Sequence, residues 1–98
     1  MTLPPDEPTI ARHVRVVGRV QGVFFRGWTK EQADALGVAG WVRNCPDGSV
    51  EALLSGSAPA VADLIERMRR GPPGAVVASL EVSDGGPAHS ASFEILRS

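Results

Sequence analysis

Groups that could hold an anion are concentrated in one stretch, Gly18-Arg19-Val20-Gln21-Gly22-Val23-Phe24-Phe25-Arg26. An alternating apolar pattern ends at Gly18 and a helical pattern begins near Phe25, so this stretch should connect a strand to a helix. Gly18 and Gly22 can adopt positive φ, which lets successive backbone N–H groups point at one anion. The start of the helix adds unpaired N–H groups and the positive end of its dipole. Because Arg26 can bind a phosphate or carboxylate bidentately beside these groups, the stretch predicts an oxyanion-binding loop with an arginine clamp.

A simpler interpretation of the same residues is that the glycines only turn the chain and that Arg26 is a solvated charge. A glycine-rich loop between a strand and a helix is by itself weak evidence for phosphate binding. The functional interpretation gains support from a second segment, Gly40-Trp41-Val42-Arg43-Asn44-Cys45-Pro46-Asp47-Gly48-Ser49-Val50-Glu51. Together the two segments resemble the signature segments of the acylphosphatase family, and the resemblance follows the order of elements over residues 10–96.

Acylphosphatases hydrolyse the mixed anhydride of a carboxylic acid and phosphate, and the resemblance implies that reaction here. The family's catalytic arginine and asparagine fall on Arg26 and Asn44, so that Arg26 would bind the phosphoryl group and Asn44 would position the attacking water. The backbone N–H groups of the loop would also hold phosphoryl oxygens, and these belong to Val20, Gln21, Gly22, Val23, Phe24 and Phe25. Since the leaving carboxylate is stable without a proton, such a site needs charge neutralisation and orientation rather than a general acid.

The same resemblance implies few binding partners. The expected ones are a small-molecule acyl phosphate as substrate and inorganic phosphate as product and competitor. No metal or other cofactor is expected, because neither segment clusters Cys, His, Asp and Glu at metal-ligand spacing. The formal net charge of −1 argues against nucleic-acid binding, and no apolar run is long enough to span a membrane. We expect a monomer.

The N-terminus and the cysteine content bear on the compartment. Cys45 is the single cysteine, so no internal disulfide can form, which suits a reducing compartment. The first residues are rich in proline and acidic side chains and do not resemble a signal peptide. We therefore expect a cytoplasmic protein in which residues 1–9 are a disordered tail and residues 10–98 form one acylphosphatase-like domain.

Hydrophobic periodicity predicts an α+β fold of the ferredoxin-like kind, β-α-β-β-α-β, with a short extra C-terminal strand. The expected strands cover residues 10–17, 38–44, 49–55, 75–83 and 93–96, and the expected helices span residues 25–36 and the segment between Ser57 and Gly71. Right-handed crossovers would place both helices on one face of an antiparallel sheet. The residues expected to face inward from the strand over residues 75–83 are Val76, Ala78, Leu80 and Val82.

Several other side chains are assigned structural roles. Cys45 stands where the family more often has threonine or serine, and it is interpreted as a turn residue because no histidine is near it in sequence. His13 and His89 are interpreted as surface residues, Asp47 as a residue that shapes the turn, and Glu51 as solvent-facing. Whether Phe24 or Trp28 lines the mouth of the site stays open, as does the physiological acyl group.

Two other functions fit the same order of elements. RNA-recognition domains display aromatic side chains on their sheet, whereas this chain has no tyrosine and only Phe93 central in a predicted strand. Domains of the acylphosphatase type also occur fused within larger maturation enzymes. Since the chain ends at Ser98, we expect a separate domain here. Hydrolysis of benzoyl phosphate, set beside binding of single-stranded RNA, discriminates these functions.

Overall fold

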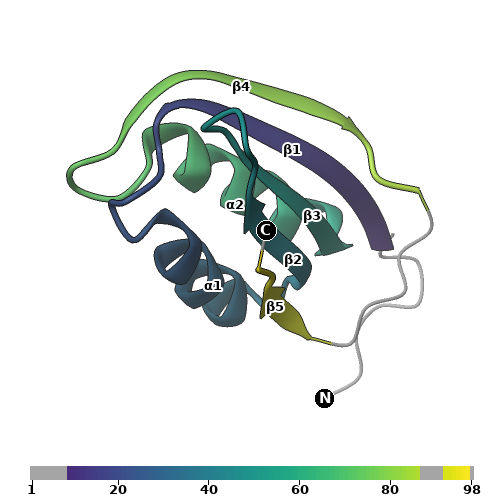
Figure 1. The fold of residues 1–98 in the computed structure, drawn as a ribbon. Coiled ribbons are helices and arrows are strands. Elements are labelled where there is room, and N and C mark those ends of the chain that lie inside the picture. Colours follow the sequence, from purple (N-terminus) through teal and green to yellow (C-terminus); the bar gives the residue numbers. More distant parts are fainter. Residues whose placement is uncertain (1–8, 87–91, 98) are drawn as a thin grey trace.

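The computed structural model describes residues 9–86 and 92–97 (Figure 1). In chain order the elements are β1 (Thr9–Arg19), α1 (Phe25–Leu36), β2 (Ala39–Asn44), β3 (Val50–Ser57), α2 (Ala58–Arg70), β4 (Val76–Asp84) and β5 (Phe93–Ile95). Each predicted helix and strand is present, with ends shifted by no more than a few residues. The predicted tail, apart from Thr9, and His89 lie outside the described residues.

The strands form one sheet in the order β4-β1-β3-β2-β5, and both helices cover the same face of it (Figure 1). The four longer strands pair antiparallel, which confirms the predicted ferredoxin-like α+β fold. The fifth strand differs from the predicted antiparallel arrangement. It runs parallel to β2, with Phe93 opposite Gly40 and Ile95 opposite Val42, so the complete sheet is mixed.

The core lies between the sheet and the helices. Its fully buried side chains come from every layer and include Val14, Val16, Phe25, Val42, Leu54, Val61, Leu64 and Met68. The α1 stripe is buried as predicted at Phe25, Thr29 and Ala33. The start of α2 is also as predicted, because the Ser57 hydroxyl accepts a hydrogen bond from the Ala60 N–H at 3.3 Å.

The inward register predicted for β4 is correct only at Leu80, which packs against the core. The other residues predicted to face inward are exposed: Val76, Ala78 and Val82. The cause is an irregularity in the pairing of β4 with β1, where the register shifts beside Gly18 and Val77 takes the inward position instead. Val82 is on the same face as Leu80, but β4 is an edge strand and leaves this side chain 43% exposed.

Polar side chains are linked on the sheet face that lacks helices. Glu51, expected to face solvent, has a side chain that is only 13% exposed, 2.9 Å from His13 Nε2 and paired with Arg43. Burial raises the pKa of the Glu51 carboxyl, but hydrogen bonds from Arg43 and His13 outweigh it and hold that pKa below its usual value. The Trp41 ring contacts both partners of Glu51, with its centre 5.6 Å from the Arg43 guanidinium carbon and 6.2 Å from the His13 ring centre.

The buried hydroxyl of Thr29 leads to a prediction on stability. Thr29 is completely buried in α1, and its Oγ1 has no hydrogen-bond partner among the residues the structure describes. Thr29→Val keeps the shape and removes the unpaired hydroxyl, so we expect a gain of about 1–2 kcal/mol in the free energy of unfolding. Thr29→Ser, which keeps the hydroxyl and loses a methyl group, should lose about 1 kcal/mol. Chemical denaturation measures both, and a destabilised Thr29→Val would contradict this assignment.

Candidate active site

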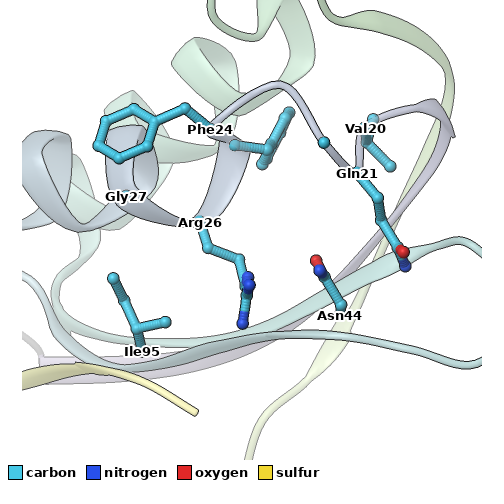
Figure 2. Close-up of a pocket in the computed structure, with 9 residues that line it drawn as sticks. Val20, Gln21, Phe24, Arg26, Gly27, Asn44 and Ile95 are labelled. Carbon is cyan, nitrogen blue, oxygen red and sulfur yellow. The ribbon is translucent and has the colours of Figure 1, made fainter. Parts of the chain in front are cut away.

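A cavity of about 260 Å³ lies where the loop after β1, the start of α1 and the ends of β2 and β5 meet (Figure 2). The residues that line it are Val20, Gln21, Gly22, Phe24, Phe25, Arg26, Gly27, Asn44 and Ile95. All of the predicted site residues except Val23 are therefore brought together. Val23 instead packs against the hydrophobic core and so attaches the loop to it. Sequence reasoning missed Gly27 and Ile95.

Two residues of the loop between β1 and α1 have positive φ. Gly22 has φ 75°, and Phe24, the N-cap residue of α1, adopts the left-handed region with φ 62° and ψ 25°. This region is uncommon for residues other than glycine. Gly18, by contrast, belongs to β1 and does not line the cavity; a Cβ there would lie 2.1 Å from the Val76 carbonyl oxygen, so its role is close strand pairing.

The start of α1 has no side-chain cap. Phe24 has no side-chain oxygen and makes no capping hydrogen bond, and the first turn of the helix carries no acidic residue. Helix N-termini usually satisfy their first N–H groups with a side chain or water. Here those groups and the positive end of the helix dipole border the cavity, where they can stabilise a bound anion.

Arg26 extends from the first turn of α1 across the cavity toward β2 (Figure 2). Its Nη1 donates a hydrogen bond to the Leu96 carbonyl oxygen at 3.3 Å, so the segment after β5 holds the guanidinium in place. In Figure 2 the guanidinium lies between Ile95 on one side and Asn44 on the other. A bidentate contact to a phosphoryl group bound in the cavity needs this kind of fixed fork.

Asn44 is the last residue of β2 and faces the cavity from the sheet (Figure 2). Its backbone is held by pairing with Val50 of β3. Directly after it the chain turns, and the Cys45 N–H donates to the Ser49 carbonyl oxygen at 2.8 Å. The Asn44 amide is therefore directed by a closed hairpin rather than by an open loop.

Asp47 stabilises this turn, as predicted. Its Oδ1 accepts hydrogen bonds from the Ser49 N–H at 3.0 Å and from the Ser49 hydroxyl at 2.6 Å. These two bonds, aided by the nearby Arg15 guanidinium, hold the pKa of the Asp47 carboxyl below its usual value. Arg15 also forms an ion pair with Asp47, which connects the turn to β1.

Gln21 connects the loop between β1 and α1 to the same turn. Its Nε2 donates to the carbonyl oxygens of Cys45 and Ser49, each at 2.9 Å. One side chain thus spans from the loop to the residue that follows Asn44. No local pattern predicts this contact, since the partners are backbone groups more than twenty positions away in the chain.

The other side chains considered in the sequence differ in where they lie relative to the cavity. Phe24 lines it, whereas Trp28 packs edge-to-face on Phe25 with ring centres 5.7 Å apart. Cys45 is a half-buried turn residue whose carbonyl group, not its thiol, makes the contacts described. His13 lies on the opposite face of the sheet, paired with Glu51.

Within residues 9–86 and 92–97, no three side chains of His, Cys, Asp or Glu lie close enough to hold a metal ion. None of the helices in these ranges is long and apolar enough to cross a membrane.

The contact made by Gln21 leads to a second prediction. Gln21→Leu removes both hydrogen bonds to the hairpin and should lower the free energy of unfolding by about 1–2 kcal/mol. Gln21→Glu should lower it further at neutral pH, because a carboxylate would face two carbonyl oxygens. That extra loss should shrink in acid, where the protonated carboxyl can donate again. Urea denaturation at two pH values measures these effects, and an unchanged stability in Gln21→Leu would show that the hairpin is held by other contacts.

Comparisons with known proteins agree with the geometry. A family model of acylphosphatases matches residues 12–95. A protein of Gloeobacter violaceus named acylphosphatase is 53% identical over 89 residues, which are 91% of this chain and 96% of that protein. The solved structure of an acylphosphatase from Coxiella burnetii has a TM-score of 0.88 at 30% identity and covers 95% of this chain and 100% of the other. The acylphosphatase structure from Bacillus subtilis has a TM-score of 0.85 at 34% identity, over 89% of this chain and 98% of the other. We conclude that the chain belongs to the acylphosphatase family, the enzymes that hydrolyse acyl phosphates.

Proposed function

We propose that this protein hydrolyses the carboxyl–phosphate bond of acyl phosphates in the cavity at the start of α1, releasing a carboxylate and inorganic phosphate. Arg26 binds the phosphoryl group and Asn44 positions the attacking water. The observation that carries this proposal is the convergence of Arg26 from α1 and Asn44 from β2 on one cavity beside an uncapped helix N-terminus.

Binding of the phosphoryl group rests on three kinds of donor. The guanidinium of Arg26 can contact two phosphoryl oxygens at once, held in direction by the Leu96 carbonyl. The backbone N–H groups of residues 20–25 and the dipole of α1 supply further positive potential. Because these groups are fixed before the substrate arrives, they can stabilise the charge that develops in the transition state without reorganising.

The chemical step needs neither an acid nor a covalent intermediate. The oxygen of a water held by the Asn44 amide attacks phosphorus, and the bond from phosphorus to the acyl oxygen breaks, with its electrons leaving on the carboxylate. That leaving group is stable without a proton, so no general acid is required. The proton of the water passes to a phosphoryl oxygen of the substrate. Positioning and charge stabilisation supply the rate enhancement.

The same proposal extends to how the protein works in the cell. We propose that it acts without a metal or other cofactor, because Arg26 and the N–H groups already neutralise the phosphoryl group. A monomer is proposed as the working unit. The single cysteine is compatible with a reducing compartment, so we retain the cytoplasm as its proposed location.

Replacing Arg26 tests the reaction and the site together. With benzoyl phosphate and excess chelator, the wild type should turn over, and Arg26→Ala should lose about a thousandfold in kcat/KM, since a bidentate charged contact contributes several kcal/mol to the transition state. Arg26→Lys should recover only part of this loss, because an ammonium cannot form the fork. Arg19→Ala is the matched control, as Arg19 is an exposed cation in the same stretch that does not line the cavity.

Different results would contradict different parts of the proposed function. Loss of wild-type activity with chelator, restored by a divalent ion, would contradict the metal-free reaction. Near-full activity in Arg26→Lys would contradict the bidentate contact. Inorganic phosphate should inhibit the wild type competitively, and a failure to inhibit would count against the anion-binding loop.

Asn44 should control turnover far more than affinity. Its amide is neutral and adds little to the binding of a phosphoryl group held by Arg26, whereas a positioned water matters mainly in the transition state. Asn44→Ala should therefore keep phosphate affinity within a few fold while kcat falls at least about a hundredfold. Asn44→Asp should not restore kcat, since it loses the donor and adds a negative charge. Calorimetry with inorganic phosphate and steady-state kinetics measure the two effects, and an unchanged kcat in Asn44→Ala would remove Asn44 from this role.

A further inference from the structure

Two side chains of the cavity wall carry no group that could bind a phosphoryl oxygen. Phe24 and Ile95 both line the cavity, and they are 68% and 42% exposed. Exposed side chains of this size leave apolar surface in contact with water, and a ligand that covered this surface would gain binding free energy. Neither side chain can donate a hydrogen bond to an anion. Their position at the cavity therefore needs an explanation other than phosphate binding.

Gly27 lies between these two side chains, and because it has no side chain the Phe24 ring can pack directly against α1 (Figure 2). A Cβ at residue 27 would lie 2.2 Å from Phe24 Cε1 and 2.3 Å from Phe24 Cζ. The ring thus occupies the space that any other side chain at residue 27 would take. As a result, the side chains of Phe24 and Ile95 are exposed on either side of Gly27, which has no side chain, and we call these three residues the apolar wall.

The direction of the reaction indicates what the apolar wall contacts. In an in-line displacement the leaving group departs opposite to the attacking water. The amide of Asn44 lies on one side of the Arg26 guanidinium, and Phe24 and Ile95 lie on the other side (Figure 2). If Asn44 holds the water, the acyl group must project toward the apolar wall.

We propose that Phe24, Gly27 and Ile95 form the binding site for the acyl group and favour substrates whose acyl group is apolar, above all aromatic. This inference rests on the proposed roles of Arg26 and Asn44. An aromatic acyl group can pack against the Phe24 ring and cover both exposed side chains, whereas an acetyl group is too small to do so.

The lysine one turn along the helix does not favour an acidic acyl group. Lys30 follows Gly27 by one turn of α1, and its ammonium is 3.1 Å from the Asp34 carboxylate and 3.1 Å from the Phe93 carbonyl oxygen. Since these oxygens already balance the ammonium, a second carboxylate on the substrate would gain little there. Succinyl phosphate should accordingly be a poorer substrate than benzoyl phosphate.

The test is the ratio of kcat/KM for benzoyl phosphate to kcat/KM for acetyl phosphate, measured for each variant and normalised to wild type. The two substrates share the phosphoryl group, so a change in this ratio reports on the acyl end alone. Ile95→Ala and Phe24→Ala should each lower the ratio about tenfold, the scale of discrimination in an apolar pocket. Val82→Ala is the matched control, because Val82 is 43% exposed and lies on the far edge strand. Its ratio should equal that of wild type.

A double substitution tests the shape of the wall. Gly27→Ala should displace the Phe24 ring and lower the ratio in the same direction. The pair Gly27→Ala with Phe24→Ala should lower it no further than Phe24→Ala alone, since the clash is then gone. Additive losses in the pair would contradict a shared surface.

The outcomes distinguish this inference from the proposed function. Equal loss of both activities in Ile95→Ala and Phe24→Ala, with an unchanged ratio, would overturn the acyl site and leave acyl phosphate hydrolysis standing. A wild-type preference for succinyl phosphate over benzoyl phosphate would also overturn it. Absence of hydrolysis of all three substrates by wild type would instead refute the proposed function, on which the inference rests.

Discussion

Two hydrogen bonds from a single amide join the parts of the site. Gln21 belongs to the loop that would hold the phosphoryl group, and its Nε2 donates to the carbonyl oxygens of Cys45 and Ser49 in the β2–β3 hairpin. Asn44 directly precedes that turn. The hairpin is also tied to β1, which leads into the loop, by strand pairing and by the ion pair of Arg15 with Asp47. Gln21 therefore helps to set the distance between the loop and Asn44, and in the proposed reaction errors in that distance would be costly.

The other constraint is the start of α1, where the helix lacks a stabilising side-chain cap. A side-chain cap typically contributes about 1 kcal/mol to a helix, and Phe24 provides none. Phe24 also adopts left-handed backbone geometry, which is unfavourable for a bulky residue. An anion in the cavity would satisfy the same N–H groups that a cap would otherwise bind. We interpret the missing cap as the condition that leaves these donors available.

Local sequence patterns predicted most of the fold and the centre of the site, and missed what depends on distant pairing. The limits of α1 follow from its apolar stripe and from Gly37, so they were predicted to the residue. The irregularity in β4 was missed because apolar residues continue to alternate in the sequence through Ala78. The register shifts only where β4 pairs with Gly18 of β1. Arg26 and Asn44 were found from their motifs, whereas the carbonyl that orients Arg26 comes from Leu96, seventy positions away in the chain.

The short strand β5 explains why the end of the chain contributes to the site at all. Without it, β2 would be an edge strand with unpaired backbone groups, a common cause of aggregation. The parallel pairing satisfies that edge, and the Leu96 N–H donates to the Val42 carbonyl oxygen at 2.9 Å. The same pairing places Ile95 in the cavity wall and turns the Leu96 carbonyl toward Arg26. One strand thus protects the edge of the sheet and orients Arg26. A change that unpairs β5 from β2 should therefore expose the edge of β2 and release the Arg26 guanidinium.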